Sequence, residues 1–160
     1  MANFKSSASP RRKNSLAGKD LTFGIVVSEW NPTITKALLK GALSVLKKNG
    51  VPEKNITVEF VPGSFELPLA AQLIQEKLHT DAVICLGCVI KGETTHYDYI
   101  CSAVSQGLMQ LNLKFGKPFI FGVLTCNNNQ QAMDRAGGIM GNKGEEAANA
   151  ALAMVELSKK

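Results

Sequence analysis

Hydrophobic residues follow two alternating patterns along the chain, and together they predict a repeated strand–helix order. The longest uninterrupted apolar run covers residues 82–90. A run of this length is typical of a strand that is buried on both faces of a parallel sheet. Shorter apolar runs predict three further strands, at 21–28, 56–61 and 119–125. We therefore expect 82–90 to be the central strand.

The segments between these strands carry apolar residues at helical spacing, which predicts helices at 33–49, 67–79, 96–113, 130–136 and 145–157. Gly50 is expected to end the first helix, and Pro68 to lie near the start of the second. Thr95 and Asp98 have the spacing of a capping box at the start of the third helix, and a glycine-rich link covers 137–144. With right-handed crossovers, this order predicts an α/β three-layer sandwich, a four-stranded parallel sheet with helices on both faces.

The positive charge of the chain is concentrated at its beginning. The 160 residues carry a formal net charge of +5, but residues 21–160 hold 13 basic and 12 acidic side chains. We therefore predict a flexible basic arm at 1–20 and a single domain at 21–160, and we expect no nucleic-acid groove. The arm lacks the apolar segment of a secretory signal, and a flexible or partner-bound arm is favoured over a transit peptide. No apolar run is long enough to cross a membrane.

The four cysteines are interpreted as small apolar residues of a reduced, cytoplasmic protein; they are Cys85, Cys88, Cys101 and Cys126. Cys85 and Cys88 have the spacing of a metal or dithiol motif. However, residues three apart on a strand point to opposite faces of the sheet. Because no second pair completes the motif, the sequence predicts no metal site.

Polar and aromatic residues follow each predicted strand. The carboxyl ends of parallel strands meet at one edge of an open α/β sheet, where ligands bind. The residues in question are Glu29, Trp30 and Asn31 after the first strand, 63–66 after the second, 91–96 after the third, and Thr125 and Asn127 after the fourth. This combination predicts a site for a flat polar ligand.

Five residues in or near these segments have a functional and a structural interpretation. His96 lies in a first helical turn, where the positive helix end disfavours the imidazolium; this suits general acid–base chemistry, and a surface histidine in a capping turn is the alternative. Trp30 and Phe65 either stack on a heterocycle or pack under loops. Arg135 and Lys143 either bind phosphate or are solvated surface charges.

Several common enzyme motifs are absent from the sequence. There is no nucleophile elbow, no Ser–His–Asp order and no dinucleotide-binding glycine fingerprint after the first strand. The segment 141–144 (GNKG) has half of the pattern of a phosphate loop, but no strand precedes it and Gly follows Lys143. The sequence therefore disfavours a hydrolase, a dinucleotide-binding protein and a protein with a nucleoside-triphosphate-binding loop.

Five blocks, in order along 21–157, resemble the 6,7-dimethyl-8-ribityllumazine synthase family of riboflavin biosynthesis. They are Trp30–Asn31, 61–68 (VPGSFELP), 87–98 (GCVIKGETTHYD), 121–125 (FGVLT), and 135–137 (RAG) with 141–144. The resemblance implies a flavodoxin-like fold and a transferase. This enzyme joins 5-amino-6-(D-ribitylamino)uracil to 3,4-dihydroxy-2-butanone 4-phosphate and releases phosphate and water, with no metal or redox cofactor.

The resemblance also implies roles for individual residues. Trp30 and Asn31 belong to the pyrimidine site, with Trp30 stacking on the ring, and His96 is the proton shuttle. The other implied pyrimidine-site residues are Ser64, Phe65, Glu66, Cys88, Val89 and Ile90. The residues that hold the butanone phosphate are Gly92, Glu93 and Thr94 with Arg135.

The resemblance further implies a pentamer with the active site between subunits, where Phe121, Arg135 and Lys143 come from the adjacent chain. A link at 137–144 without an insertion favours an icosahedral shell, and riboflavin synthase is an implied partner. Trp30 replaces the Phe of many members, and Ile139 replaces the Lys frequent in shell formers. The alternatives are a non-catalytic flavin- or lumazine-binding or structural shell protein, and a flavodoxin-like mononucleotide carrier.

Overall fold

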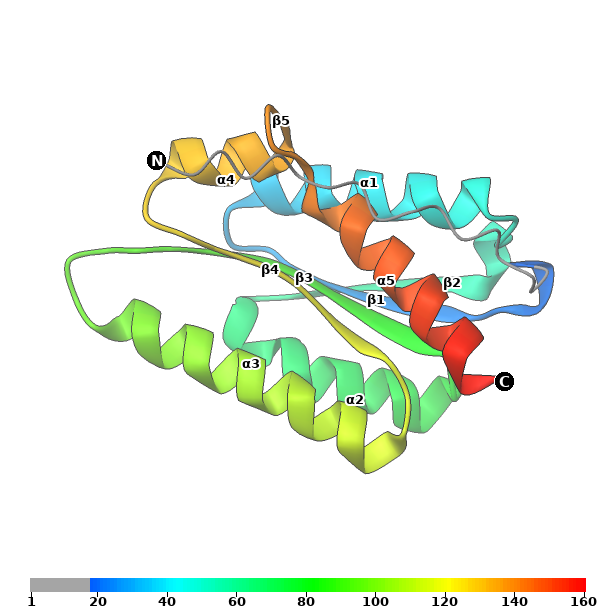
Figure 1. Cartoon of the computed structure of the whole chain (residues 1–160). Helices are drawn as coiled ribbons and strands as arrows, with labels where there is room; N and C mark the ends of the chain where they lie inside the picture. Colours follow the sequence, from blue (N-terminus) through cyan, green and yellow to red (C-terminus); the bar gives the residue numbers. More distant parts are fainter. Residues whose placement is uncertain (1–17) are drawn as a thin grey trace.

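The computed structural model describes residues 18–160, which form a parallel sheet between two layers of helices (Figure 1). The strands are β1 (Phe23–Ser28), β2 (Ile56–Val61), β3 (Ala82–Ile90) and β4 (Phe119–Cys126), in the order β2-β1-β3-β4. The helices are α1 (Pro32–Lys48), α2 (Leu67–Leu78), α3 (His96–Phe115), α4 (Asn129–Arg135) and α5 (Lys143–Ser158). The predicted flavodoxin-like three-layer sandwich is confirmed.

The central strand β3 is buried on both faces of the sheet. Ile84, Leu86 and Cys88 pack into the apolar cluster with α1 and α5, whereas Val83 and Cys85 pack into the cluster with α2 and α3. This alternation confirms the prediction for 82–90, and it places the Cys85 and Cys88 side chains on opposite faces as expected. The four cysteines are free. No helix within 18–160 is long and apolar enough to span a membrane.

The first described residues lie within the predicted arm and contact the domain. Gly18–Asp20 forms a short 3-10 helix, and the Asn55 side chain donates to the Lys19 carbonyl at 3.0 Å. The rest of the predicted arm, residues 1–17, lies outside the described residues. Gly50 adopts a φ of 83° directly after the C-cap of α1, a conformation that favours glycine, as its predicted role at the helix end requires.

The glycine-rich link predicted at 137–144 is more regular than expected: β5 (Ala136–Gly138) and β6 (Gly141–Asn142) form an antiparallel ribbon, and α5 begins at Lys143 instead of 145. One local prediction is wrong. Thr95 and Asp98 do not form a capping box, since the Thr95 side chain makes no capping hydrogen bond. Instead, the neighbouring Thr94 hydroxyl accepts a hydrogen bond from the His96 backbone amide at 3.4 Å.

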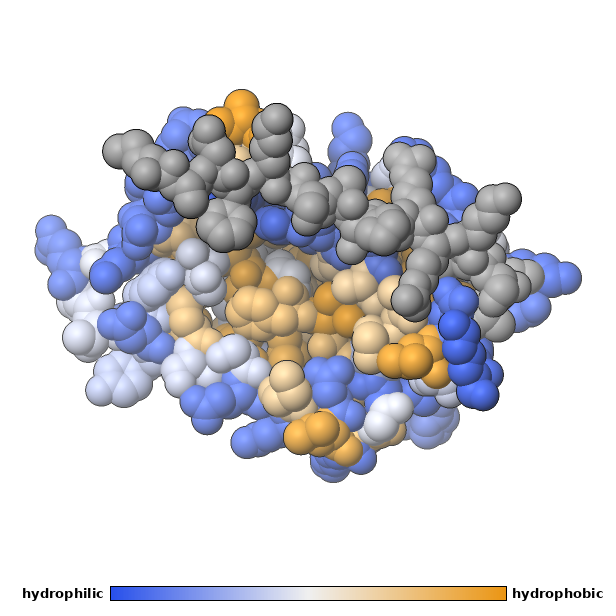
Figure 2. Space-filling view, viewed as in Figure 1, coloured by the Kyte–Doolittle hydropathy of each residue, from blue (hydrophilic) through white to orange (hydrophobic). Residues whose placement is uncertain are grey.

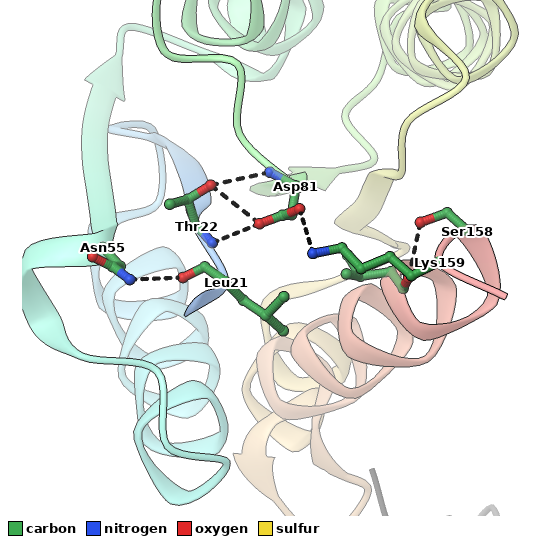
Figure 3. A network of polar contacts seen from close by, with 7 residues as sticks. Leu21, Thr22, Asn55, Asp81, Ser158 and Lys159 are labelled. Carbon is green, nitrogen blue, oxygen red and sulfur yellow. Dashed lines mark hydrogen bonds and ion pairs between the residues drawn. The ribbon is translucent and has the colours of Figure 1, made fainter. Parts of the chain in front are cut away.

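A polar network ties the C-terminal residues to the amino ends of β1 and β3 (Figure 3). The Asp81 carboxylate accepts hydrogen bonds from the Thr22 backbone amide at 2.8 Å and from its hydroxyl at 3.2 Å. Its other oxygen lies 3.0 Å from the Lys159 ammonium. Burial acts to raise the pKa of Asp81, but the contacts with Thr22 and Lys159 outweigh it and lower the pKa below its ordinary value of 3.8. The network therefore stabilises the ionised form in the folded state.

Asp81→Ala is expected to lower the free energy of unfolding at pH 7 by about 1 to 3 kcal/mol, because two donors on Thr22 and the Lys159 ammonium lose their acceptor. A lowered folded-state pKa contributes stability that is present above the unfolded pKa, and this contribution disappears as the pH falls through the folded value. Urea unfolding of both proteins at one protein concentration should show the difference narrowing below about pH 3.9.

Glu53→Ala is the matched control, because Glu53 forms an exposed ion pair with Lys47 at 3.6 Å and such pairs contribute little. An Asp81→Ala difference of the same size at pH 7 and at pH 2.5 would contradict the assignment of this stability to the ionised carboxylate.

Candidate active site

The carboxyl ends of the four strands meet at one edge of the sheet, on the left in Figure 1, opposite the C-terminus. At the end of β1, Trp30 is 71% exposed and Asn31 occupies the left-handed region, with a φ of 59°. The Asn31 side-chain amide donates a hydrogen bond to the Cys88 carbonyl at 3.0 Å. Asn31 thus links the loop after β1 to the end of β3 and leaves Trp30 open to solvent.

A single turn of 3-10 helix, Ser64–Glu66, follows β2. The turn buries the Ser64 side chain and leaves those of Phe65 and Glu66 exposed. The Glu66 carboxylate accepts a hydrogen bond from the Gly63 amide at 2.9 Å, which fixes the turn. Ser64 is buried, its hydroxyl has no hydrogen-bond partner within the described chain, and a Cβ on Gly87 would lie only 2.6 Å from that oxygen.

The segment after β3 carries the largest set of predicted ligand-binding residues, and most of it is exposed. Val89 and Ile90 are half-buried at the end of the strand. The Lys91 amide then donates to the Cys126 carbonyl of β4 at 2.8 Å, which ties the start of the loop to the neighbouring strand. The exposed residues that follow are Gly92, Glu93, Thr94, Thr95 and His96.

A cavity of about 420 Å³ lies along β4 beside the ends of α4 and α5. Its lining includes Phe121, Arg135 and Lys143, so three of the predicted ligand-binding residues share one hollow surface. The Arg135 guanidinium donates to the Gln131 carbonyl at 3.1 Å within α4, and the Lys143 ammonium pairs with Glu146 at 2.7 Å. Lys143 is therefore already paired with a carboxylate, whereas Arg135 forms no ion pair with a carboxylate among the described residues.

The thiols near these residues stay protonated at neutral pH. Burial raises the pKa of Cys88 to about 12, with a smaller contribution from Cys126. Burial also raises the pKa of Cys126, and the nearby Arg135 opposes part of that rise. Neither thiol has the lowered pKa of a cysteine nucleophile. Across residues 18–160, no three His, Cys, Asp or Glu side chains are grouped so as to hold a metal ion.

Within one chain, the predicted ligand-binding residues fall into two groups. Asn31 is hydrogen-bonded to Cys88, and the Ser64 hydroxyl lies beside Gly87, so these residues meet at the ends of β1, β2 and β3. Phe121, Arg135 and Lys143 line the cavity at β4, and Trp30, Phe65 and His96 are not among its lining residues.

Two residues around the cavity were missed by the sequence reasoning. Glu146 pairs with Lys143, and no local pattern distinguishes it from other exposed acids of α5. Asn142 caps α5 by accepting hydrogen bonds from the Gly144 and Glu145 amides. The pattern Asn-x-x-Glu over 142–145 is that of a helix start, and it would have placed the beginning of α5 correctly.

The comparisons with known proteins agree with one another. The family model described as 6,7-dimethyl-8-ribityllumazine synthase matches residues 20–159. The 6,7-dimethyl-8-ribityllumazine synthase of Cytophaga hutchinsonii is 61% identical over 133 residues, which cover 83% of this chain and 84% of that protein. The relative of the same name from Parabacteroides distasonis is 54% identical over 139 residues, which cover 87% of each chain. The one from Bacteroides fragilis is 54% identical over 136 residues, which cover 85% of this chain and 95% of that protein.

The fold and its polar strand ends define an α/β protein of the kind that binds small ligands at the carboxyl edge of a sheet. The matches along nearly the whole described chain make the class more specific. The chain belongs to the 6,7-dimethyl-8-ribityllumazine synthase family and is a transferase.

Two substitutions of Asn31 should distinguish the contribution of its side-chain hydrogen bond to stability from that of its left-handed backbone conformation. Asn31→Ala loses the bond to the Cys88 carbonyl and also places a less tolerant residue at a φ of 59°, whereas Asn31→Gly loses only the bond. We expect Asn31→Ala to unfold at lower urea concentration than Asn31→Gly, with a difference of about 1 kcal/mol in the free energy of unfolding. Equal stability of the two variants would contradict this account of the turn.

Proposed function

We propose that this transferase, which condenses 5-amino-6-(D-ribitylamino)uracil with 3,4-dihydroxy-2-butanone 4-phosphate in riboflavin biosynthesis, does so in a site built by two neighbouring chains. The strand-end group of one chain supplies Trp30, Phe65 and His96, and the cavity of its neighbour supplies Phe121, Arg135 and Lys143. The observation that carries this proposal is that Trp30, Phe65 and His96 do not line the cavity that holds Phe121, Arg135 and Lys143. Within the described residues the Arg135 guanidinium donates to a backbone carbonyl and pairs with no carboxylate, so it keeps donors for an anion.

The strand-end group suits the pyrimidine substrate. The exposed rings of Trp30 and Phe65 stack on the heterocycle, and Phe121 of the neighbouring cavity adds a third ring. Asn31, Ser64 and Glu66 read the polar edge of the uracil and the ribityl chain. Backbone groups of Cys88, Val89 and Ile90 line the same pocket. The raised pKa of Cys88 keeps its thiol neutral beside the ring.

The exposed loop after β3 and the cavity suit the phosphorylated ketone. Gly92, Glu93 and Thr94 form the loop that binds the phosphate, and the open space around Gly92 lets the phosphate approach the backbone closely. Arg135 binds the phosphate through two parallel hydrogen bonds and takes up negative charge as the phosphate leaves. Lys143 acts as a point charge once it exchanges its contact with Glu146 for the phosphate.

His96 moves the protons that this reaction requires. The amine of the pyrimidine attacks the ketone carbonyl to form an imine with loss of water. Removal of a proton from the next carbon expels the phosphate, and the resulting enol becomes a second ketone. The ribitylamino nitrogen attacks this ketone, and loss of a second water closes the ring of 6,7-dimethyl-8-ribityllumazine. Each step needs a proton donor or acceptor, and an exposed imidazole at the start of α3 can exchange protons with solvent. Because both substrates are already reactive, most of the rate enhancement comes from holding them together. The reaction uses no metal or redox cofactor.

An exposed apolar surface supports self-association of the chain. Figure 2 shows hydrophobic residues gathered over β4 and the adjoining parts of α3 and α5. The exposed apolar residues of these elements are Phe121 on β4, Met109 and Leu113 on α3, and Met154 and Leu157 on α5. β4 is also an edge strand with an unpaired side. An apolar patch at an open sheet edge marks a protein interface.

We further propose a pentamer as the basic assembly, with pentamers packed into an icosahedral shell and riboflavin synthase as a partner. The short β5–β6 ribbon, which has no insertion, supports the shell. Ile139 in this region is 88% exposed, so an apolar side chain is presented where a cation is frequent in the family's shell formers. The four free cysteines support a cytoplasmic location.

Arg135→Ala is expected to lower the steady-state rate more than His96→Ala, because the departing phosphate loses its bidentate partner and only the Lys143 charge remains. We expect roughly a 10³-fold loss for Arg135→Ala and roughly a 10- to 100-fold loss for His96→Ala. Phosphate release with both substrates present is the measurement. His79→Asn is the control, since His79 is exposed and ends α2 in the left-handed region, a conformation that Asn tolerates. The reverse order of losses would refute this division of roles.

Co-assembly of two impaired variants should restore activity if the site is shared between chains. One variant carries Trp30→Ala with His96→Ala, and the other carries Arg135→Ala. In randomly mixed assemblies, about a quarter of the shared sites combine two intact halves. Phosphate release should then rise well above the mean of the separate variants, and sedimentation velocity should show one assembled species of large mass. Activity that never exceeds this mean would place the whole site within one chain.

A further inference from the structure

We propose that Asn142 is the positioning residue for the two phosphate-binding cations, Arg135 and Lys143, although it does not line their cavity. This inference rests on the proposed function of those cations. It assigns specificity for the phosphorylated substrate to a side chain that touches neither the substrate nor the reacting atoms.

The Asn142 side chain forms hydrogen bonds both with the start of α5 and with α1. Its carbonyl oxygen accepts hydrogen bonds from the Gly144 amide at 2.8 Å and from the Glu145 amide at 3.3 Å. Its side-chain NH₂ donates to the Ala37 carbonyl in α1 at 3.0 Å. One amide therefore starts one helix and anchors it to another that lies 105 positions earlier in the chain.

The fit around this side chain is tight enough to determine its position. A Cβ on Gly41 of α1 would lie between 2.5 and 2.8 Å from three atoms of the Asn142 side chain. A Cβ on Gly144 would meet the Leu38 carbonyl of the same helix. Both glycines are therefore required for the close approach of α1 and α5, and the Asn142 side chain occupies the space that a side chain at position 41 would need.

The two cations are placed directly beside this anchor. Lys143 follows Asn142 in the chain and begins α5. Arg135 precedes Ala136, and Ala136 pairs with Asn142 in the β5–β6 ribbon. A displacement of Asn142 is therefore transmitted directly to Lys143, and through Ala136 to Arg135, whereas Trp30, Phe65 and the end of β3 are not linked to Asn142 in this way.

A residue that only caps a helix lowers stability when it is replaced, and it has no reason to affect one substrate more than the other. A positioning residue for the cations changes the KM for the butanone phosphate selectively. Displacements of about 1 Å at a site are known to reduce rates by up to about a hundredfold. The KM values for the two substrates therefore distinguish the two roles.

The experiment measures the KM for each substrate in the assembled enzyme with Asn142→Ser and with Asn142→Ala. Asn142→Ser keeps a helix-capping acceptor but loses the donor to Ala37, whereas Asn142→Ala loses both. We expect the KM for the butanone phosphate to rise about tenfold in Asn142→Ser and further in Asn142→Ala, with less than a twofold change for the pyrimidine. Asn149→Ala is the control, because Asn149 is exposed on α5 and bonds only to the Glu145 carbonyl of its own helix at 2.9 Å.

Gly41→Ala tests the same inference while leaving Asn142 intact. Replacing a glycine within a helix by alanine favours the helix, so a purely local effect predicts unchanged or higher stability and unchanged KM values. The new Cβ would instead push on the Asn142 side chain, and we expect the same selective rise in the KM for the butanone phosphate. In an Asn142→Ala background, where the obstructing atoms are gone, Gly41→Ala should add no further rise.

Arg135→Ala, measured in parallel, separates the failure of this inference from the failure of the proposed function. If Arg135→Ala leaves the KM for the butanone phosphate unchanged, the cavity does not bind phosphate, and both proposals are overturned. If Arg135→Ala raises that KM but Asn142→Ser and Gly41→Ala change both KM values equally or not at all, the positioning role alone is overturned. Inhibition by inorganic phosphate provides a second readout, and it should weaken by the same factor as the KM rises.

Discussion

The parallel pairing of β3 on both sides is the constraint on which the rest of the structure depends. β1 and β4 pair with β3 in the same direction, so every strand ends at one edge of the sheet. Because β3 is buried on both faces, it requires a helical layer above and below. Four segments therefore leave the sheet at the same edge, one after each strand, and the sheet itself brings together the polar residues that begin them.

A second consequence of this topology is that β4, at the edge of the sheet, has a cavity beside it that is lined by Phe121, Arg135 and Lys143. Trp30 and Phe65 follow β1 and β2, on the other side of β3, and they do not line this cavity. The unpaired edge of β4, with its exposed Phe121, is where the proposed two-chain site would be completed.

Most of the fold was predictable because its signals are local or periodic. The apolar run at 82–90 and the helical spacing between strands depend only on burial, and the structure places all four strands and five helices where they were expected to within a few residues. The differences concern a short backbone ribbon at 136–142 and side-chain hydrogen bonds. Thr95 has the right spacing for a capping box but makes no such bond, whereas Asn142 caps α5 because its side chain is held against α1, far away in the sequence.

The sequence by itself determined the order of strands and helices, the opposite facing of Cys85 and Cys88, and the chemical types of residue at the strand ends, because periodicity and residue type are properties of short segments. Only the tertiary structure decided which of these residues touch. Two of these contacts join distant points of the chain: the hydrogen bond from Asn31 to Cys88, and the packing of Asn142 against Gly41. The ion pair of Lys143 with Glu146 fixes one rotamer among several. Such contacts follow from the packing of helices on the sheet, which no single segment encodes.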